Sequence, residues 1–359
     1  MAVLRIRLQS IVGFAVLALL AGGCGGPGVA LQAVRPQPLS AARAPDGLSV
    51  LARARLYVLD SNLYSGTPSV TIFARGADGN ATPLRTIAGT DTGMNTPGGI
   101  AVDGSGKIYV SDYFAASYGA VFVYAADASG DAPPIATITD GIADPSAVAV
   151  DEAGNVYVAN FEAGSVTVYT AGTYALARTI TGPRDISFSY CDGLTVDRSG
   201  KIYLLVGSYN GAPIKRNSSS YGGFIGVFPA DANGPTMPLQ LISGAKTRLT
   251  DPLGIAVDAQ SRIYVTAPER RASRVLIFAA NANGNVEPAR ELSGAQTELT
   301  GPNAIALDGR GSIFVTNTSY TGHPSVVAYP RGARGNRPPV RKLSGAKTQL
   351  QSITYVAVH

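Results

Sequence analysis

The chain has 359 residues, 45% apolar and 15% charged, a composition that supports a packed core and excludes an intrinsically disordered protein. Its 42 glycines and 23 prolines are typical of many short strands joined by turns. The formal net charge is +5, but no run of lysine or arginine supplies clustered phosphate contacts, so we expect no nucleic-acid partner.

The first 24 residues predict an export signal, with Arg5 and Arg7 before an apolar stretch that is too short to span a membrane. Residues 19–24, LLAGGC, resemble a bacterial lipobox, which implies that Cys24 carries the lipid anchor. An ordinary cleavable signal with an incidental cysteine is the alternative. We expect export and lipid anchoring in the bacterial cell envelope. Gly25 offers no obvious retention signal, which favours the outer membrane.

Residues 25–53 are rich in Gly, Pro, Ala and Arg without any sustained period, and they predict a flexible tether. The folded domain should therefore span residues 54–359. The second cysteine, Cys191, has no partner if Cys24 is lipidated, so we expect a free, buried thiol and no disulfide scaffold.

One β-rich phrase occurs six times in the folded part. It reads RLYVLD (55–60), KIYVSD (107–112), NVYVAN (155–160), KIYLLV (201–206), RIYVTA (262–267) and SIFVTN (312–317). A phrase such as GIAVD (99–103) precedes most copies, and two further β-rich runs follow each one. Four runs in each unit of about 50 residues predict an all-β, six-bladed β-propeller of four-stranded blades.

The two ends of the repeat array predict how the ring closes. The first unit lacks its first strand, and the last residues, SITYVAVH (352–359), read as a first strand without a blade. Pairing of this C-terminal strand with the first blade would remove the open edges of a linear array. We expect such a ring to be a monomer.

The repeated phrases resemble those of NHL-repeat propellers, whose blades carry G-I-A-V-D, then G-x-I-Y-V-x-D, then V-x-V-F. The resemblance covers residues 54–359. It implies the propeller fold and leaves the function open, since one fold hosts many activities.

Two sets of polar residues have a structural interpretation. Five aspartates close the first strands, and we expect each to cap its turn through backbone N–H groups: Asp103, Asp151, Asp197, Asp258 and Asp308. Asn- and Asp-rich segments such as ANANGNVEP (280–288) and GARGNRPP (332–339) should be turns. None has the several carboxylates and closing Glu of a calcium loop.

Variable loops between the second and third strands are the candidate binding surface, because such loops carry function on rigid scaffolds. We expect them to bind a cell-envelope protein or a glycan through Tyr64, Tyr113, Phe114, Tyr118, Phe161, Tyr209, Lys215, Arg216, Tyr221, Arg270 and Tyr320. Two alternatives stay open: that these aromatic residues only pack the loops, and that the protein is purely structural.

A hydrolase is the enzymatic alternative. The chain distantly resembles the six-bladed regucalcin/gluconolactonase superfamily, whose members hold one divalent cation, calcium or similar, and hydrolyse lactones. The resemblance implies that Asp192 and Asn303 are metal ligands and catalytic residues. It lacks the family's Glu, since the other inner-strand starts offer Gly98, Ser146, Leu253 and Ser352. The binding-module hypothesis expects no cofactor and no catalytic residue.

Overall fold

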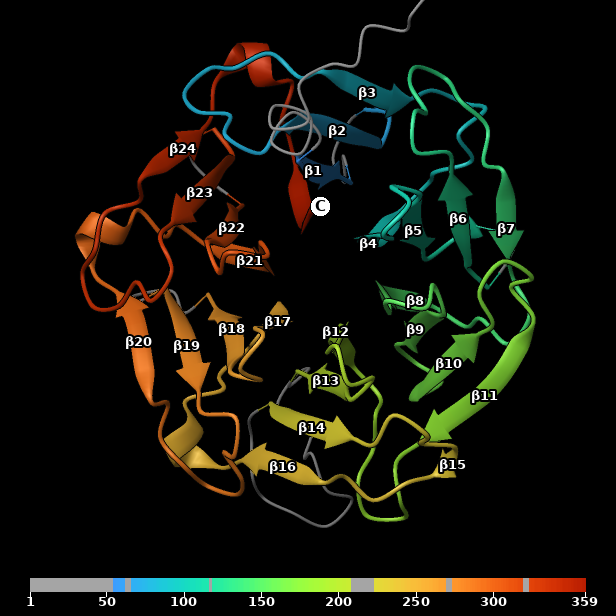
Figure 1. The fold of residues 1–359 in the computed structure, drawn as a ribbon, viewed down its shortest axis with the longest axis vertical. Helices are drawn as coiled ribbons and strands as arrows, with labels where there is room; N and C mark the ends of the chain where they lie inside the picture. Colours follow the sequence, from blue (N-terminus) through green and yellow to red (C-terminus); the bar gives the residue numbers. More distant parts are fainter. Residues whose placement is uncertain (1–53, 62–65, 116–117, 208–222, 269–272, 319–322) are drawn as a thin grey trace, which may run out of the picture. The chain divides into compact units, whose positions relative to one another are not determined.

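Short strands joined by tight turns make up the computed structural model, as the repeated phrases predict. The structure describes residues 54–61, 66–115, 118–207, 223–268, 273–318 and 323–359. All of them fall in one unit, Pro45–His359. Figure 1 shows six sheets arranged as blades around a central channel, with the first strand of each blade innermost. The predicted fold class is confirmed.

The strand order of each blade follows the sequence, apart from the innermost strand of blade 1. Blade 1 contains β25 (Ile353–Val358), β1 (Arg55–Asp60), β2 (Ser69–Ala74) and β3 (Arg85–Ala88). Blade 2 contains β4 (Pro97–Val102), β5 (Ile108–Asp112), β6 (Ala120–Tyr124) and β7 (Ala136–Ile138). Blade 3 contains β8 (Pro145–Val150), β9 (Val156–Asn160), β10 (Ser165–Tyr169) and β11 (Leu176–Thr181).

The second half of the ring repeats this plan. Blade 4 contains β12 (Cys191–Val196), β13 (Ile202–Val206), β14 (Phe224–Phe228) and β16 (Gln240–Ser243). Blade 5 contains β17 (Ile255–Val257), β18 (Ile263–Ala267), β19 (Arg274–Phe278) and β20 (Arg290–Ser293). Blade 6 contains β21 (Pro302–Leu307), β22 (Ile313–Asn317), β23 (Ser325–Tyr329) and β24 (Arg341–Leu343). The short β15 (Gly234–Pro235) adds a parallel strand to β11 of blade 3.

The C-terminal strand closes the ring as predicted. β25 pairs antiparallel with β1, and the backbone N–H groups of Arg55 and His359 each donate to the other residue's carbonyl at 2.9 and 3.1 Å. The Asp60 carboxylate accepts the backbone N–H groups of Gln351 (2.6 Å) and Ser352 (2.9 Å), which fixes the entry to β25. The two ends of the repeat array therefore share one sheet.

The core lies between neighbouring blades. Alternate residues of β1 enter different clusters: Tyr57 and Leu59 pack towards blade 2, and Leu56 and Val58 pack towards blade 6. Both faces of each sheet are thus buried, which explains the nearly continuous apolar runs of the second strands. Three leucines that follow the fourth strands are also buried between blades: Leu249, Leu299 and Leu350.

The segments between the third and fourth strands form latches between blades, a role beyond the predicted turns. Gly284 forms a parallel bridge to Ile242 of the preceding blade, and the Asn285 Oδ1 accepts the Lys246 N–H at 2.8 Å. The same acceptor position recurs in Asn80, Asp131 and Asn336. We call residues 75–83, 125–134, 279–288 and 330–339 the latch loops.

The two ends of the ring differ. The loop face carries the connections between second and third strands and those that enter the inner strands. The turn face carries the tight turns after the inner strands. There, Asp197 accepts N–H groups from Ser199 (2.8 Å) and Lys201 (3.1 Å) and the Tyr203 hydroxyl (2.9 Å). Burial raises the pKa of Asp197, but these hydrogen bonds outweigh it and hold the pKa below its usual value.

The other four aspartates cap their turns in the same way, so that prediction is confirmed. Within the described part of the chain, no helix has the length and apolar character needed to cross a membrane.

Candidate functional site

A ring of irregular residues surrounds the loop-face end of the channel. The ladder between first and second strands shifts register around Gly98, Ser146 and Asp192, each of which adds an extra residue to its inner strand. The same shift occurs near Asn303 and at Thr354. Bulges of this kind redirect side chains next to functional sites. The residue of β25 equivalent to Asp192 is therefore Thr354, and the assignment of Ser352 was wrong because it ignored the bulge.

Asp192 is the one carboxylate among these bulge residues. Its side chain lies against Gly207, where an added Cβ would stand 2.1 Å from Oδ2. Burial raises the pKa of Asp192 to about 7. The Gly207 backbone N–H lowers it, and the neighbouring Asp251 charge raises it further. Asp192 is therefore poised to exchange a proton near neutral pH.

Tyr355 reaches Asp192 from the opposite side of the channel. Its strand, β25, belongs to blade 1, which faces blade 4 across the ring in Figure 1. The Tyr355 hydroxyl donates to the Asp192 carbonyl oxygen at 3.0 Å. A channel cavity of about 220 Å³ is lined by inner-strand residues of all six blades, including Tyr355. This tyrosine therefore links two opposite blades through the channel.

Ser146 completes the polar part of the site. Its hydroxyl donates to the Cys191 carbonyl oxygen at 2.5 Å, which connects blades 3 and 4. Cys191 is fully buried, and burial raises the pKa of its thiol to about 12. A thiol in this state is a poor nucleophile. The prediction of a free, buried cysteine is confirmed.

An aromatic chain borders these polar residues on the loop face. The ring of Phe161 lies 6.2 Å from Tyr113 and 5.2 Å from Tyr190, in edge-to-face geometry with both. Tyr113 lies against Gly98, where a Cβ would come within 2.8 Å of its ring. Burial raises the pKa of Tyr113, and the negative charge of Asp192 raises it further. Tyr113 therefore packs inward, beside Asp192.

Phe114 and Tyr118 lie on the same loop as Tyr113 and point outward. Their exposed fractions are 67% and 72%, and they are the two aromatic residues among the exposed large apolar side chains in the described part of the chain. The Phe114 and Tyr113 rings lie 6.4 Å apart. Phe114 and Tyr118 are therefore exposed aromatic residues next to a half-buried row of rings formed by Tyr113, Phe161 and Tyr190.

The predicted binding residues fall into two groups. Tyr113, Phe114, Tyr118 and Phe161 share the loop face, and Tyr113 and Phe161 also pack against other aromatic rings there. The others lie outside the described residues: Tyr64, Tyr209, Lys215, Arg216, Tyr221, Arg270 and Tyr320. The predicted lipidation residue, Cys24, also lies outside them.

Sequence reasoning missed Tyr355, and a register alignment would have exposed it. In the other five inner strands the equivalent residue is small: Gly99, Ala147, Gly193, Gly254 and Ala304. The sixth inner strand has a tyrosine at this position. Its large side chain departs from the repeat and extends into the channel. Tyr190 was likewise missed because it precedes a first strand, where the repeat carries no aromatic residue.

The proposed metal ligands belong to two different blades, and the pair stays a prediction. Asp192 and Asn303 occupy bulges of blades 4 and 6, with blade 5 between them. The Asn303 carbonyl oxygen accepts the Thr266 hydroxyl at 2.5 Å, and no contact joins Asn303 to Asp192 within the described ranges. Among the residues that the structure describes, no group of three or more His, Cys, Asp and Glu side chains is arranged to hold a metal ion.

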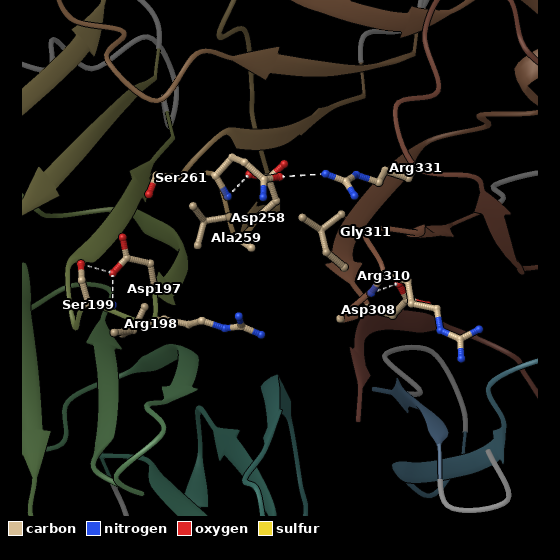
Figure 2. A pocket seen from close by; sticks show the side chains of 15 residues that line it. Asp197, Arg198, Ser199, Asp258, Ala259, Ser261, Asp308, Arg310, Gly311 and Arg331 are labelled. Atoms are coloured by element: carbon tan, nitrogen blue, oxygen red, sulfur yellow. Dashed lines mark hydrogen bonds between the residues drawn. The ribbon is translucent and has the colours of Figure 1, made fainter. Parts of the chain in front are cut away.

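The turn face carries a separate cavity of about 390 Å³ at the opposite end of the ring. Figure 2 shows its lining, with Asp197, Asp258 and Asp308 hydrogen-bonded within their own turns. Arg198, Arg310 and Arg331 also line it, and Arg331 extends towards the turn after β17. The carboxylates are engaged in capping, and Arg198 forms an ion pair with Glu152 at 3.3 Å, so Arg310 and Arg331 are the charged groups left to meet a ligand.

Fold and site together define a six-bladed β-propeller with a polar and aromatic cluster at one channel mouth. The structure is similar to that of a protein of unknown function from Bacteroides caccae, at 11% identity and a TM-score of 0.58, covering 85% of this chain and 98% of that one. Such a likeness shows the shared fold alone.

A second similar structure is the hydrazine synthase of Kuenenia stuttgartiensis, at 12% identity and a TM-score of 0.47, covering 72% of this chain and 66% of that one. This weaker likeness adds nothing on function. No protein-family model and no curated protein matches the chain. The resemblance to NHL-repeat and regucalcin-like propellers is thus confirmed for the fold, and membership of either family stays a prediction.

Proposed function

We propose that this chain is a non-catalytic, exported and lipid-anchored β-propeller that binds a cell-envelope protein or a glycan on its loop face. The observation that carries the proposal is the aromatic edge formed by Phe114 and Tyr118, which are 67% and 72% exposed. Exposed aromatic side chains cost solvation energy in a protein that leaves them bare, and they are frequent anchors of binding surfaces.

The surroundings of this edge support recognition of a ligand with both apolar and polar groups. The Phe114 ring lies near the ring of Tyr113, which packs on Phe161, and the Asp192 carboxyl lies beside Tyr113. Aromatic rings stack on sugar or side-chain faces, and a carboxyl that can be protonated acts as hydrogen-bond donor or acceptor. A rigid scaffold limits the entropy lost on binding.

The double variant Phe114→Ala/Tyr118→Ala tests the proposal. We expect ligands identified with the full chain by glycan array and by envelope crosslinking to lose at least roughly tenfold in affinity, as for removal of a hot spot. Leu84→Ala/Ile135→Ala is the matched control, since these apolar side chains, which directly precede the outer strands β3 and β7, are 54% and 57% exposed. Equal losses in both variants, or none in either, would contradict loop-face recognition.

A metal-dependent lactone hydrolase is the second candidate, and the raised pKa of Asp192 is the observation that favours it, since perturbed carboxyls cluster in active sites. Asp192 and Asn303 would hold one divalent cation that polarises the lactone carbonyl. Metal analysis of the full chain with a lactone assay tests this candidate. One ion per chain, together with lactone turnover that is lost in Asp192→Ala, would favour the hydrolase over the binding proposal. Absence of both the ion and the turnover would contradict the hydrolase.

A further inference from the structure

The boundary between blades 5 and 6 gathers arginines that form no ion pair with any described residue. A hollow of about 550 Å³ is lined by Arg290, Gly332, Arg334, Asn336, Arg337 and Pro338, without any acidic residue. A Cβ on Gly332 would stand 3.9 Å from the Arg290 Nη1, so the side chain from blade 5 lies over the latch loop of blade 6. We call this hollow, together with the adjoining Arg331, the arginine groove.

Some arginines elsewhere in the ring form short ion pairs, while others, such as Arg85 and Arg178, donate to backbone carbonyl oxygens. Arg75, Arg248 and Arg262 each lie within 3 Å of a carboxylate oxygen, at 2.9, 2.7 and 2.6 Å. Within the described residues, no ion pair involves Arg290, Arg310, Arg331, Arg334 or Arg337. Like charges held together without a counter-charge cost electrostatic free energy, which an anionic ligand would recover.

Arg334 departs from a feature that the latch loops of blades 1 and 5 share. The residue before the latch glycine is Asp78 in blade 1 and Asn283 in blade 5. Each accepts a backbone N–H from the preceding blade, that of Lys342 and that of Leu241, both at 2.9 Å. An arginine has no acceptor and cannot make this bond. Its position therefore contributes nothing to the latch.

Arg337 departs from a second feature of the latch loops. The residue two positions after the latch glycine is Ala81 in blade 1, Ala132 in blade 2 and Val286 in blade 5, and each packs against a core cluster. In blade 6 this position holds an exposed arginine. Two positions of this loop that have structural roles in other blades thus hold solvent-exposed arginines. Such departures from a repeat are expected at binding sites.

Arg331 connects the groove with the turn face. The equivalent residue of blade 1, Arg75, forms an ion pair with Asp308 of the neighbouring blade. Arg331 instead donates to the Gln260 Oε1 at 3.3 Å. This acceptor is neutral, so it does not compensate the positive charge of Arg331. Arg310 lines the same turn-face cavity (Figure 2). The unpaired cations therefore continue from the rim of the ring to the end of the channel.

We propose that the arginine groove binds a linear anionic polysaccharide. Guanidinium groups pair with carboxylate or phosphate groups through two parallel hydrogen bonds, and a series of them along a groove suits a chain with repeated anionic groups. The hollow lies between two blades, whereas a membrane needs a flat face. Pro338 is its single apolar side chain among the lining residues, so a protein would lack an apolar anchor there.

The test measures binding of the full chain in detergent to polygalacturonate, with neutral dextran as the reference polymer. We expect binding to polygalacturonate that weakens as NaCl is raised, and a loss of roughly tenfold or more in affinity for Arg334→Ala/Arg337→Ala. Both residues are exposed, so the thermal midpoint should stay unchanged. Lys246→Ala/Lys347→Ala is the matched control, which removes two exposed charges from other blade connections and should bind as wild type.

Equal binding of the two polymers, or equal losses in the two double variants, overturns the proposal. A preference for phosphatidylglycerol over phosphatidylcholine nanodiscs that the arginine variant removes, without polysaccharide binding, would assign the groove to a membrane and also overturn it. The groove is independent of the loop face, so Phe114→Ala/Tyr118→Ala should leave polygalacturonate binding intact. This result separates failure of one proposal from failure of the other.

Discussion

At the scale of single residues, Asp192 is the group whose chemistry depends most on its surroundings. A bulge turns it towards the channel mouth, burial raises its pKa to about 7, and Tyr355 contacts its backbone from the opposite blade. The same carboxyl at a solvated strand end would titrate near its ordinary value of about 4. The local sequence CDGL contains no sign of this shift.

The raised pKa predicts a pH-dependent stability. Between about pH 4 and 7 folded Asp192 keeps a proton that the unfolded chain has released, so the free energy of unfolding should fall as pH rises through this window. Asp192→Asn should remove this dependence and be more stable than wild type at pH 8, by on the order of 2–4 kcal/mol. Urea unfolding from pH 5 to pH 8 measures the free energy of unfolding of both proteins, with Asp231→Asn at an exposed site as the control. The same dependence of this free energy on pH in all three proteins would contradict a raised pKa of Asp192.

At the scale of elements, strand pairing and latches hold the ring together. β25 gives blade 1 its innermost strand, and the latch loops join the outer strands of blades 1, 4, 5 and 6 to the next blade. The repeated phrases predicted the strands and the closing role of residues 352–359. They did not predict the latches. Asn and Asp next to Gly are common turn residues, and the sequence does not show that their side chains bind the backbone of the preceding blade.

Removal of residues 353–359 should abolish cooperative unfolding, because β1 would lose its neighbour and a buried edge would be exposed. A milder variant, Asp60→Ala, leaves the N–H groups of Gln351 and Ser352 without their acceptor and should cost about 1–3 kcal/mol. Thermal and urea unfolding measure both. A truncated chain that melts at the wild-type temperature would show that the ring does not need its closing strand.

At the scale of the whole molecule, we propose a lipid-anchored ring with two different binding surfaces. Aromatic residues gather on the loop face, and unpaired arginines extend between blades 5 and 6 towards the turn face. Two unlike surfaces on one rigid ring would let the protein hold two different ligands at once. The anchor at Cys24 and the tether of residues 25–53 lie outside the described residues and stay predictions.

Cys24→Ala tests the anchor. We expect loss of labelled palmitate from the protein and its shift from the membrane to the soluble fraction, because acyl chains contribute roughly 0.8 kcal/mol per buried methylene. Cys191→Ala is the matched cysteine control, since this residue is buried in the ring. Unchanged labelling in Cys24→Ala would support the ordinary cleavable signal.

The sequence by itself determined the number of blades, their strand order and the closing strand, because a blade is a local unit whose turns and β-rich runs lie within about 50 residues. It also placed Tyr113, Phe114, Tyr118 and Phe161 on one face. Only the tertiary structure decided which of them pack and which stay exposed, and that Tyr355 reaches Asp192. These outcomes depend on bulges and on contacts between blades far apart in sequence, and a repeat pattern carries no record of either.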